Sequence, residues 1–169
     1  MKILKKSYVG LGGNIGDSVS LLKQALKEIS LLEGIEDLKV SSFYQTTPVS
    51  DLSQNSYINA VCSFMTSLPV FELLKKLQQI EENLGKVKKP KNEPRPIDLD
   101  LLFFGDSCIK EKELQIPHPR WHERLFVLVP LSELTEEVSF FEKGKITKKN
   151  IKSLLREFAN LNNETVLML

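Results

Sequence analysis

The spacing of apolar residues along the chain switches between a period of two and a period near 3.6, and each switch predicts a new element. Short alternating runs predict strands, and two longer runs with apolar residues three and four apart predict amphipathic helices. In order, we expect a strand at 7–11, a helix at 17–34, strands at 38–46 and 57–66, a helix at 69–85 and a strand at 98–104.

This order, β-α-β-β-α-β, predicts an α+β fold with a ferredoxin-like core, in which an antiparallel sheet carries helices on one face. Beyond it, residues 126–134 predict a buried helix interrupted by Pro130, and residues 151–158 predict a short helix before an apolar end. Additional C-terminal helices or strands should therefore complete the core. A chain of 169 residues fits one domain, 1–169.

Composition narrows the class of protein. The net charge is only +1, which argues against a general nucleic-acid or membrane-surface binder. No window approaches the roughly 20 apolar residues of a membrane span, and the basic N-terminus lacks a signal-peptide apolar stretch. Cys62 and Cys108 lie in apolar surroundings and are expected to be reduced and buried. We therefore expect a cytoplasmic protein.

The strongest candidate for chemistry is the pair Asp98 and Asp100, which a single leucine separates in an apolar strand. Side chains two apart in a strand share a face, so both carboxylates should project together. Their repulsion favours a hard divalent cation between them, and Arg95 just upstream suits a phosphate. A magnesium–phosphate site is one interpretation. An exposed strand end facing Lys and Arg is the other, and spacing alone does not decide between them.

Two loops invite a phosphate-binding interpretation. The glycine-containing turn at 12–17 follows a strand, but it lacks the lysine of a P-loop and fits the dinucleotide fingerprint poorly, so a tight turn is expected. The stretch 86–96 is basic and interrupted by prolines. It is either a solvated linker or a lid that brings cations to a polyphosphate.

Three further pairs of side chains are candidates for binding. His118 and His122 have the spacing of a zinc pair, but Pro119 opposes a regular helix there and no third ligand is evident. Contact with phosphate through His118 and Arg124 is more plausible. Two other pairs each share one face of an element, namely Tyr57 with Asn59 on a strand and Gln78 with Glu81 on a helix.

Three segments together go beyond these general features. They are YVGLGGNIGD at 8–17, SSFYQTTPV at 41–49 with YINA at 57–60, and PRPIDLDLLFFG at 94–105 with IPHPRWHERLFVLVPL at 116–131. In this order the chain resembles the 6-hydroxymethyl-7,8-dihydropterin pyrophosphokinase family of folate biosynthesis, from about residue 8 to 134. The resemblance implies a ferredoxin-like enzyme that transfers pyrophosphate from ATP to the pterin hydroxymethyl group, releases AMP and uses two Mg²⁺ ions.

The resemblance also implies roles for individual residues. Asp98 and Asp100 would bind the metal and, with Lys88 and Arg95, form the catalytic set. The pterin would be bound by Thr46, Pro48, Val49, Tyr57, Asn59 and Phe126. ATP would be bound by Gln78, Glu81, Lys88, Arg95, Leu101, His118 and Arg124. We expect a monomer whose partners are ATP and the pterin, with no nucleic acid and no membrane.

The departures from the family pattern fall in the basic stretch 86–96. An aromatic–glycine pair is common before Pro-Arg, where this chain has Asn92 and Glu93. Lys86 and Lys88 replace arginines, and Pro96 replaces a threonine. Lysine keeps the charge but loses the bidentate fork. Two alternatives therefore remain, a ferredoxin-like module that binds without catalysis and a metal-dependent phosphohydrolase.

Overall fold

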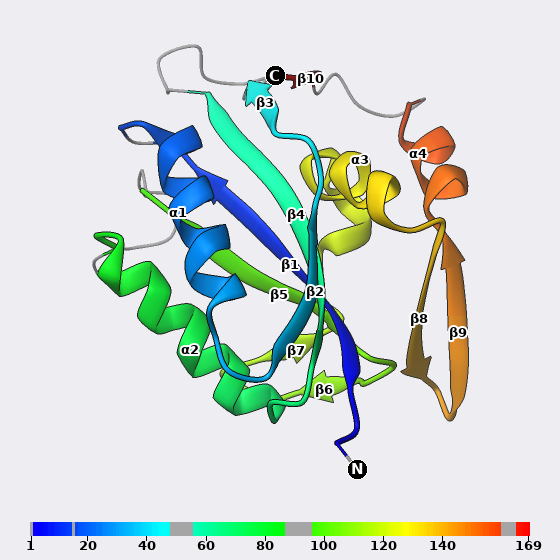
Figure 1. The fold of residues 1–169 in the computed structure, drawn as a ribbon. Helices are drawn as coiled ribbons and strands as arrows, with labels where there is room; N and C mark the ends of the chain where they lie inside the picture. Colours follow the sequence, from blue (N-terminus) through cyan, green and yellow to red (C-terminus); the bar gives the residue numbers. More distant parts are fainter. Residues whose placement is uncertain (1, 15, 48–55, 87–95, 160–164) are drawn as a thin grey trace.

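The fold is an antiparallel sheet with helices on either side (Figure 1), and the computed structural model describes residues 2–14, 16–47, 56–86, 96–159 and 165–169. The main elements in chain order are β1 (Lys5–Gly13), α1 (Ser18–Ser30), β2 (Ile35–Val40), β3 (Tyr44–Thr47), β4 (Tyr57–Thr66), α2 (Val70–Asn83) and β5 (Asp98–Phe104). They are followed by β6 (Ile109–Lys110), β7 (Gln115–Ile116), the 3₁₀ turn η1 (Trp121–Glu123), α3 (Leu125–Leu134), β8 (Glu137–Glu142), β9 (Lys145–Asn150), α4 (Ile151–Ala159) and β10 (Thr165–Met168).

The sheet confirms the predicted ferredoxin-like core. Its order is β10-β3-β4-β1-β5, with β2 also paired to β4, and all pairs are antiparallel. The two central strands, β1 and β4, pair along nine residues from Lys5↔Thr66 to Gly13↔Ile58. On the other side of β1, strand β5 forms one end of this order and contains the two aspartates. The sequence order thus brings the aspartates beside the centre of the sheet.

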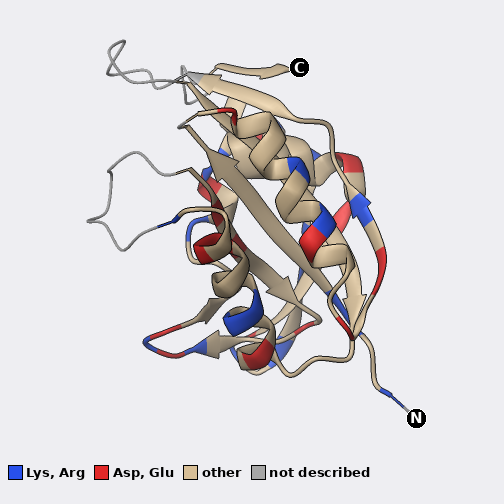
Figure 2. Cartoon of the chain, turned by 60° about the vertical axis from the view of Figure 1, so that its left-hand side comes forward, with Lys and Arg blue, Asp and Glu red and all other residues tan. Residues whose placement is uncertain are grey.

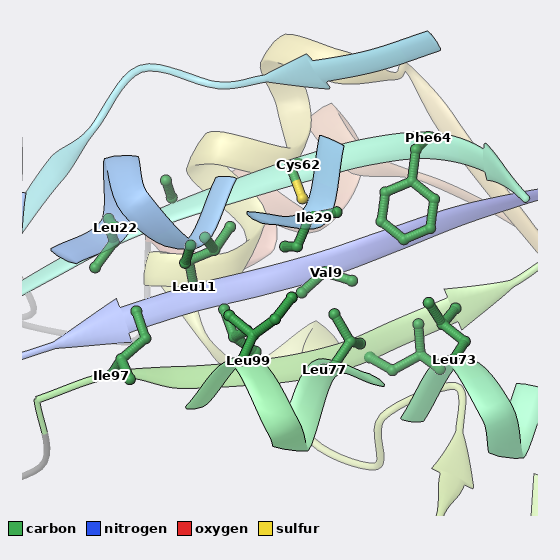
Figure 3. Close-up of a cluster of buried hydrophobic side chains, with 14 of the residues drawn as sticks. Val9, Leu11, Leu22, Ile29, Cys62, Phe64, Leu73, Leu77, Ile97 and Leu99 are labelled. Carbon is green, nitrogen blue, oxygen red and sulfur yellow. The ribbon is translucent and has the colours of Figure 1, made fainter. Parts of the chain in front are cut away.

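Each face of the sheet carries its own core, because neighbouring side chains of a strand point to opposite faces. Val9 and Cys62 belong to the core under α1 and α2 (Figure 3). Tyr8 and Val61 belong to a second core that includes Leu128 of α3. The two helices of the predicted core, α1 and α2, cover one face as expected, and the additional helix α3 covers the other (Figure 1). Because α3 is apolar on nearly all sides, it needs this second face for burial.

Most helix boundaries follow the sequence signals, but α1 ends at Ser30, before the expected end at Gly34. Asp17 caps α1, with its carboxylate accepting a hydrogen bond of 3.1 Å from the Ser20 backbone N–H. Pro69 precedes α2, and Gly85 follows it with a positive φ of 98° that glycine adopts without strain. No helix in the described ranges is long and apolar enough to span a bilayer.

Three local expectations differ from the structure. The strand predicted at 38–46 is two strands, β2 and β3. Between them the Ser41 N–H donates to the Val61 carbonyl at 2.9 Å, while the Ser41 hydroxyl in place of its carbonyl accepts the Val61 N–H at 3.0 Å. The turn predicted to begin at Gly12 begins later, since β1 continues through Gly13. The hairpin of β8 and β9 and the terminal strand β10 were not predicted as strands.

Charged residues of both signs are interspersed on this fold. Figure 2 shows Lys and Arg next to Asp and Glu along several helices and strands, rather than collected on one basic face. This distribution agrees with the net charge of +1.

Candidate active site

The two aspartates of β5 project from the same side of the strand. Leu99 between them is buried in the core under α1 and α2, so Asp98 and Asp100 point away from that core. Asp98 is half-buried, whereas Asp100 is accessible from a cleft. Loss of hydration among the surrounding groups and the charge of Asp98 raise the pKa of Asp100, while His118 and Arg124 partly offset this effect. The paired geometry expected from the sequence is therefore present.

Lys86 links Asp98 of β5 to Glu81 near the end of α2. Its Nζ donates to Asp98 Oδ1 at 2.7 Å and also to Glu81 Oε2. Burial alone would lower the pKa of Lys86, but the hydrogen bonds to Asp98 and Glu81 outweigh it and the pKa is raised. Lys86 therefore stays charged and neutralises part of the acidic pair.

Glu81 is a buried carboxylate that connects α2 to β5. It is 6% exposed, and its Oε2 accepts the Leu99 backbone N–H at 2.9 Å. Burial raises the pKa of Glu81, although its contacts with Lys86 and Leu99 act in the opposite direction. The resemblance implied that Glu81 contacts ATP. The structure shows in addition that its carboxylate fixes the helix against the aspartate strand.

His118 and Arg124 reach the aspartates from the segment before α3. The backbone N–H of His118 donates to the Leu102 carbonyl at 3.0 Å. The ring Nδ1 of His118 accepts the Arg120 backbone N–H at 3.2 Å. Burial lowers the pKa of His118, so the ring is neutral near pH 7 and its proton lies on Nε2. Burial also lowers the pKa of Arg124, but a guanidinium remains charged. Both groups affect Asp100 and form a cationic or donor side of the site.

A cavity of about 430 Å³ lies between α2, β5 and the His118 segment, and Asp98 and Arg124 are not part of its lining. Residues expected to bind ATP line it together with the second aspartate: Gln78, Glu81, Leu101, His118 and Asp100. Leu74 and Leu114 add apolar surface. The cavity therefore combines an apolar wall with anionic and hydrogen-bonding groups. His122 is placed differently, with its Nε2 3.7 Å from Glu123.

Of the residues expected to bind the pterin, those that the structure describes lie on the α3 side of the sheet. Asn59 is 6% exposed, and its Nδ2 donates to Thr46 Oγ1 at 3.1 Å. Tyr57 is the cross-strand partner of Thr46, and it lies on the same face of β4 as Asn59, two residues away. Phe126, in the first turn of α3, packs on the core of that same face. Its ring centroid lies 5.4 Å from the Arg124 guanidinium.

Four of the expected site residues lie outside the described ranges, namely Pro48, Val49, Lys88 and Arg95. Sequence reasoning missed two features of the site. It noted Lys86 only as a replaced arginine, and it assigned Gly12 to a turn. In fact Gly12 pairs with Asn59 on one side and with Asp98 on the other. The signal that could have identified this row of Asn59, Gly12 and Asp98 was a pair of glycines two residues apart in a strand, Gly10 and Gly12.

Comparison with known proteins identifies the family of this chain. Residues 8–136 match the family model of 7,8-dihydro-6-hydroxymethylpterin-pyrophosphokinase. The 2-amino-4-hydroxy-6-hydroxymethyldihydropteridine pyrophosphokinase of Bacillus subtilis is 42% identical over 132 residues, which cover 78% of this chain and 79% of the relative. The Haemophilus influenzae protein of the same name is 36% identical over 154 residues, covering 91% and 93%.

Longer proteins match as well. The folic acid synthesis protein fol1 of Pneumocystis carinii is 39% identical over 158 residues, which cover 88% of this chain but only 21% of that protein. The structure of wild-type Plasmodium falciparum HPPK-DHPS with SDX-DHP superposes with a TM-score of 0.70 at 14% identity, covering 95% of this chain. This chain spans 45% of the Plasmodium chain, and at 14% identity the likeness concerns the fold alone.

The fold, the paired aspartates and the named relatives point to the same class of protein. The relatives with matching length are named as pyrophosphokinases, which are ATP-dependent transferases. The chain therefore belongs to the 7,8-dihydro-6-hydroxymethylpterin-pyrophosphokinase family of enzymes.

Proposed function

We propose that the protein transfers pyrophosphate from ATP to 6-hydroxymethyl-7,8-dihydropterin in folate biosynthesis, giving the pterin diphosphate and AMP. The observation that carries this proposal is the row Asn59–Gly12–Asp98 across three strands. It brings an amide suited to a heterocycle to the same face as the carboxylates suited to a metal–phosphate group. The family match over residues 8–136 supports the same reaction.

Two carboxylates, Asp98 and Asp100, suit Mg²⁺ better than they suit a metal ion whose ligands all come from the protein. Within the described ranges, no three His, Cys, Asp or Glu side chains gather into a complete metal site. Mg²⁺ is typically bound by one or two carboxylates, with water and substrate phosphates completing its coordination. We propose that the pair holds two ions, which would neutralise phosphate charge and lower the pKa of the attacking hydroxyl.

The pterin would lie on the α3 side of the sheet. The Asn59 amide offers a hydrogen-bond acceptor and a donor in one plane, which suits the amide edge of the ring. Tyr57 and Phe126 supply flat apolar surfaces for its two faces. The hydrogen bond from Asn59 to Thr46 fixes the amide, so the ring is oriented before the reaction begins.

The nucleotide would occupy the cavity beside α2. Its phosphates would receive hydrogen bonds from the neutral His118 through Nε2–H and from the Arg124 guanidinium. Gln78 and Leu101 line the same cavity and would contact the rest of ATP. Lys88 and Arg95 belong to the stretch outside the described residues, and we propose that they bring further positive charge to the polyphosphate.

The chemical step follows from this placement. The pterin hydroxyl oxygen forms a bond to the β-phosphorus of ATP, the bond from that phosphorus to the oxygen bridging to the α-phosphate breaks, and AMP leaves. The hydroxyl proton is released as the new bond forms. Residues of the chain contribute orientation and charge neutralisation, which is the usual division of work in phosphoryl-type transfer. We propose a cytoplasmic monomer as the working form.

Phosphorus NMR of the protein with ATP, Mg²⁺ and 6-hydroxymethyl-7,8-dihydropterin tests the proposal. We expect AMP and a pterin diphosphate to appear together and in equal amounts. Release of phosphate without pterin would instead identify a phosphohydrolase. Binding of both substrates without AMP would identify a binding module, and no pterin binding would overturn the substrate assignment.

A further inference from the structure

Gly12 occupies the middle of the row that joins the two halves of the site. It pairs with Asn59 of β4 and with Asp98 of β5. Adjacent strands lie about 5 Å apart, so a group bound between the amide and the carboxylate must pass directly over Gly12.

The backbone does not explain why this residue is glycine. Gly12 is absent from the described residues with positive φ, so an L-residue could adopt its conformation. Glycine inside a strand costs stability relative to alanine, and it often marks a place where a ligand or another chain approaches closely. The reason for glycine must therefore be found in what lies above it.

What lies above Gly12 is the oxygen of Asn59. A Cβ at this position would be 2.8 Å from Asn59 Oδ1, and the next nearest atoms would be 3.9 Å away. The Asn59 side chain is buried, and its Nδ2 is held by Thr46. Among the described residues, none donates a hydrogen bond to its Oδ1. A buried amide oxygen without a donor is unfavourable unless a ligand supplies one.

We propose that Gly12 determines substrate specificity by leaving room for Asn59 and for a flat ring over β1. In this arrangement the Asn59 oxygen accepts an N–H of a cyclic amide, and the ring's reactive arm extends across Gly12 toward Asp98. Any side chain at position 12 would push the amide away from Thr46 and obstruct the ring. This inference rests on the proposed function, because it names the part of the site that selects the heterocycle.

The test is Gly12→Ala, with Gly10→Ala as a matched control on the same strand and face. A Cβ at Gly10 would meet only Leu102 side-chain atoms at 3.6–3.8 Å, which is ordinary contact. Calorimetric titration would measure binding of 6-hydroxymethyl-7,8-dihydropterin in the presence of Mg²⁺ and a non-hydrolysable ATP analogue, and binding of that analogue alone. We expect Gly12→Ala to weaken pterin binding about tenfold or more and analogue binding less than about twofold. Gly10→Ala should bind both nearly as the wild type does.

A double variant separates a local role from general damage. If Gly12 acts in part through the Asn59 oxygen, the loss of pterin binding in the variant with both Gly12→Ala and Asn59→Ala should be smaller than the product of the two single losses. Pterin binding by Gly12→Ala equal to wild type would overturn the inference, as would equal losses for both ligands. Failure of the wild type to bind the pterin would instead overturn the proposed function, so the two failures are distinguishable.

Discussion

At the scale of single residues, the acidic pair is only partly compensated within the protein. Lys86 contacts Asp98 directly, whereas His118 and Arg124 act on Asp100 through their electrostatic field. Burial lowers the pKa of His118, so it supplies little positive charge near pH 7. A cation placed beside Asp100 would therefore relieve the most repulsion.

We predict that Asp100→Asn abolishes most turnover without unfolding the protein. The substitution keeps the shape of the side chain but removes the charge that would bind Mg²⁺, and the loss of several kcal/mol of charge stabilisation slows the reaction by about a hundredfold or more. The rate of AMP formation and Mn²⁺ binding would measure the effect. Glu82→Gln, on the exposed side of α2, is the control, and near-normal turnover of Asp100→Asn would contradict the metal assignment.

We also predict that Phe126→Ala weakens pterin binding far more than ATP binding. The ring would contact the flat heterocycle, and its removal leaves intact the cavity proposed for ATP, which Phe126 does not line. Titration with each ligand separately measures the difference. Because Phe126 packs partly on the second core, Phe126→Leu serves as a variant that retains apolar packing without the aromatic face. Equal losses of pterin and ATP binding would contradict the role.

Residue-level features were predictable where they depend on alternation alone. The shared side of Asp98 and Asp100, and of Tyr57 and Asn59, follows from a period of two. The bridge from Lys86 to Asp98 depends on how α2 ends against β5, which is a long-range arrangement. No local pattern in the sequence contains that information.

At the scale of elements, one contact explains why the predicted second strand is broken. The Glu133 carboxylate at the end of α3 accepts the Ser42 N–H at 2.8 Å and the Ser42 hydroxyl at 2.7 Å. Burial, followed by the hydrogen bond and charge of Glu133, raises the pKa of Tyr44. Alternating sequence favours one continuous strand, but this carboxylate supplies partners that let β2 end and β3 begin.

We predict that Glu133→Ala destabilises the protein by about 1 kcal/mol, since the exposed hydrogen bonds from the backbone N–H and the hydroxyl of Ser42 are lost. Urea unfolding would measure the change in the free energy of unfolding. Glu82→Ala on α2 also removes an exposed glutamate from a helix, and it should change the free energy by less than about 0.5 kcal/mol. Equal effects of the two substitutions would show that the Glu133 contacts do not stabilise the junction.

At the scale of the whole molecule, the central strands are enclosed by both cores. Cys62 of β4 is fully buried under α1 and α2 as expected, but the expectation that Cys108 is also buried was wrong, because its side chain is exposed. Burial raises the pKa of the Cys62 thiol to about 12. Cys62 therefore becomes reactive only when the sheet itself opens.

We predict that a disulfide reagent at pH 8 titrates one thiol in the native protein and two in denaturant. With a pKa of about 12, only about one Cys62 in ten thousand is a thiolate at pH 8, and burial also blocks the reagent. The absorbance of the released thiol counts the reacted groups. Cys108→Ser should remove the native reaction entirely, and rapid modification of Cys62 in that variant would contradict a closed core.

The overall topology was predictable because the order of elements and the central strands carry strong periodic signals. The side of the sheet that α3 covers was not predictable, since a segment that is apolar all round has no polar face to indicate its orientation. The β8–β9 hairpin was also missed, because its second strand is mostly lysine and exposed. The placement of α3 and of the β8–β9 hairpin depends on packing in the second core, which a local sequence pattern does not encode.

The contacts along the outer side of β5 have a consequence for solubility. A strand at the end of a sheet exposes backbone groups that can pair with another copy of the chain and lead to aggregation. Here the Leu99 N–H is taken by Glu81 and the Leu102 carbonyl by the N–H of His118. The groups that arrange the reaction site thus also protect the strand from intermolecular pairing, and replacing Glu81 would affect the yield of soluble protein as well as catalysis.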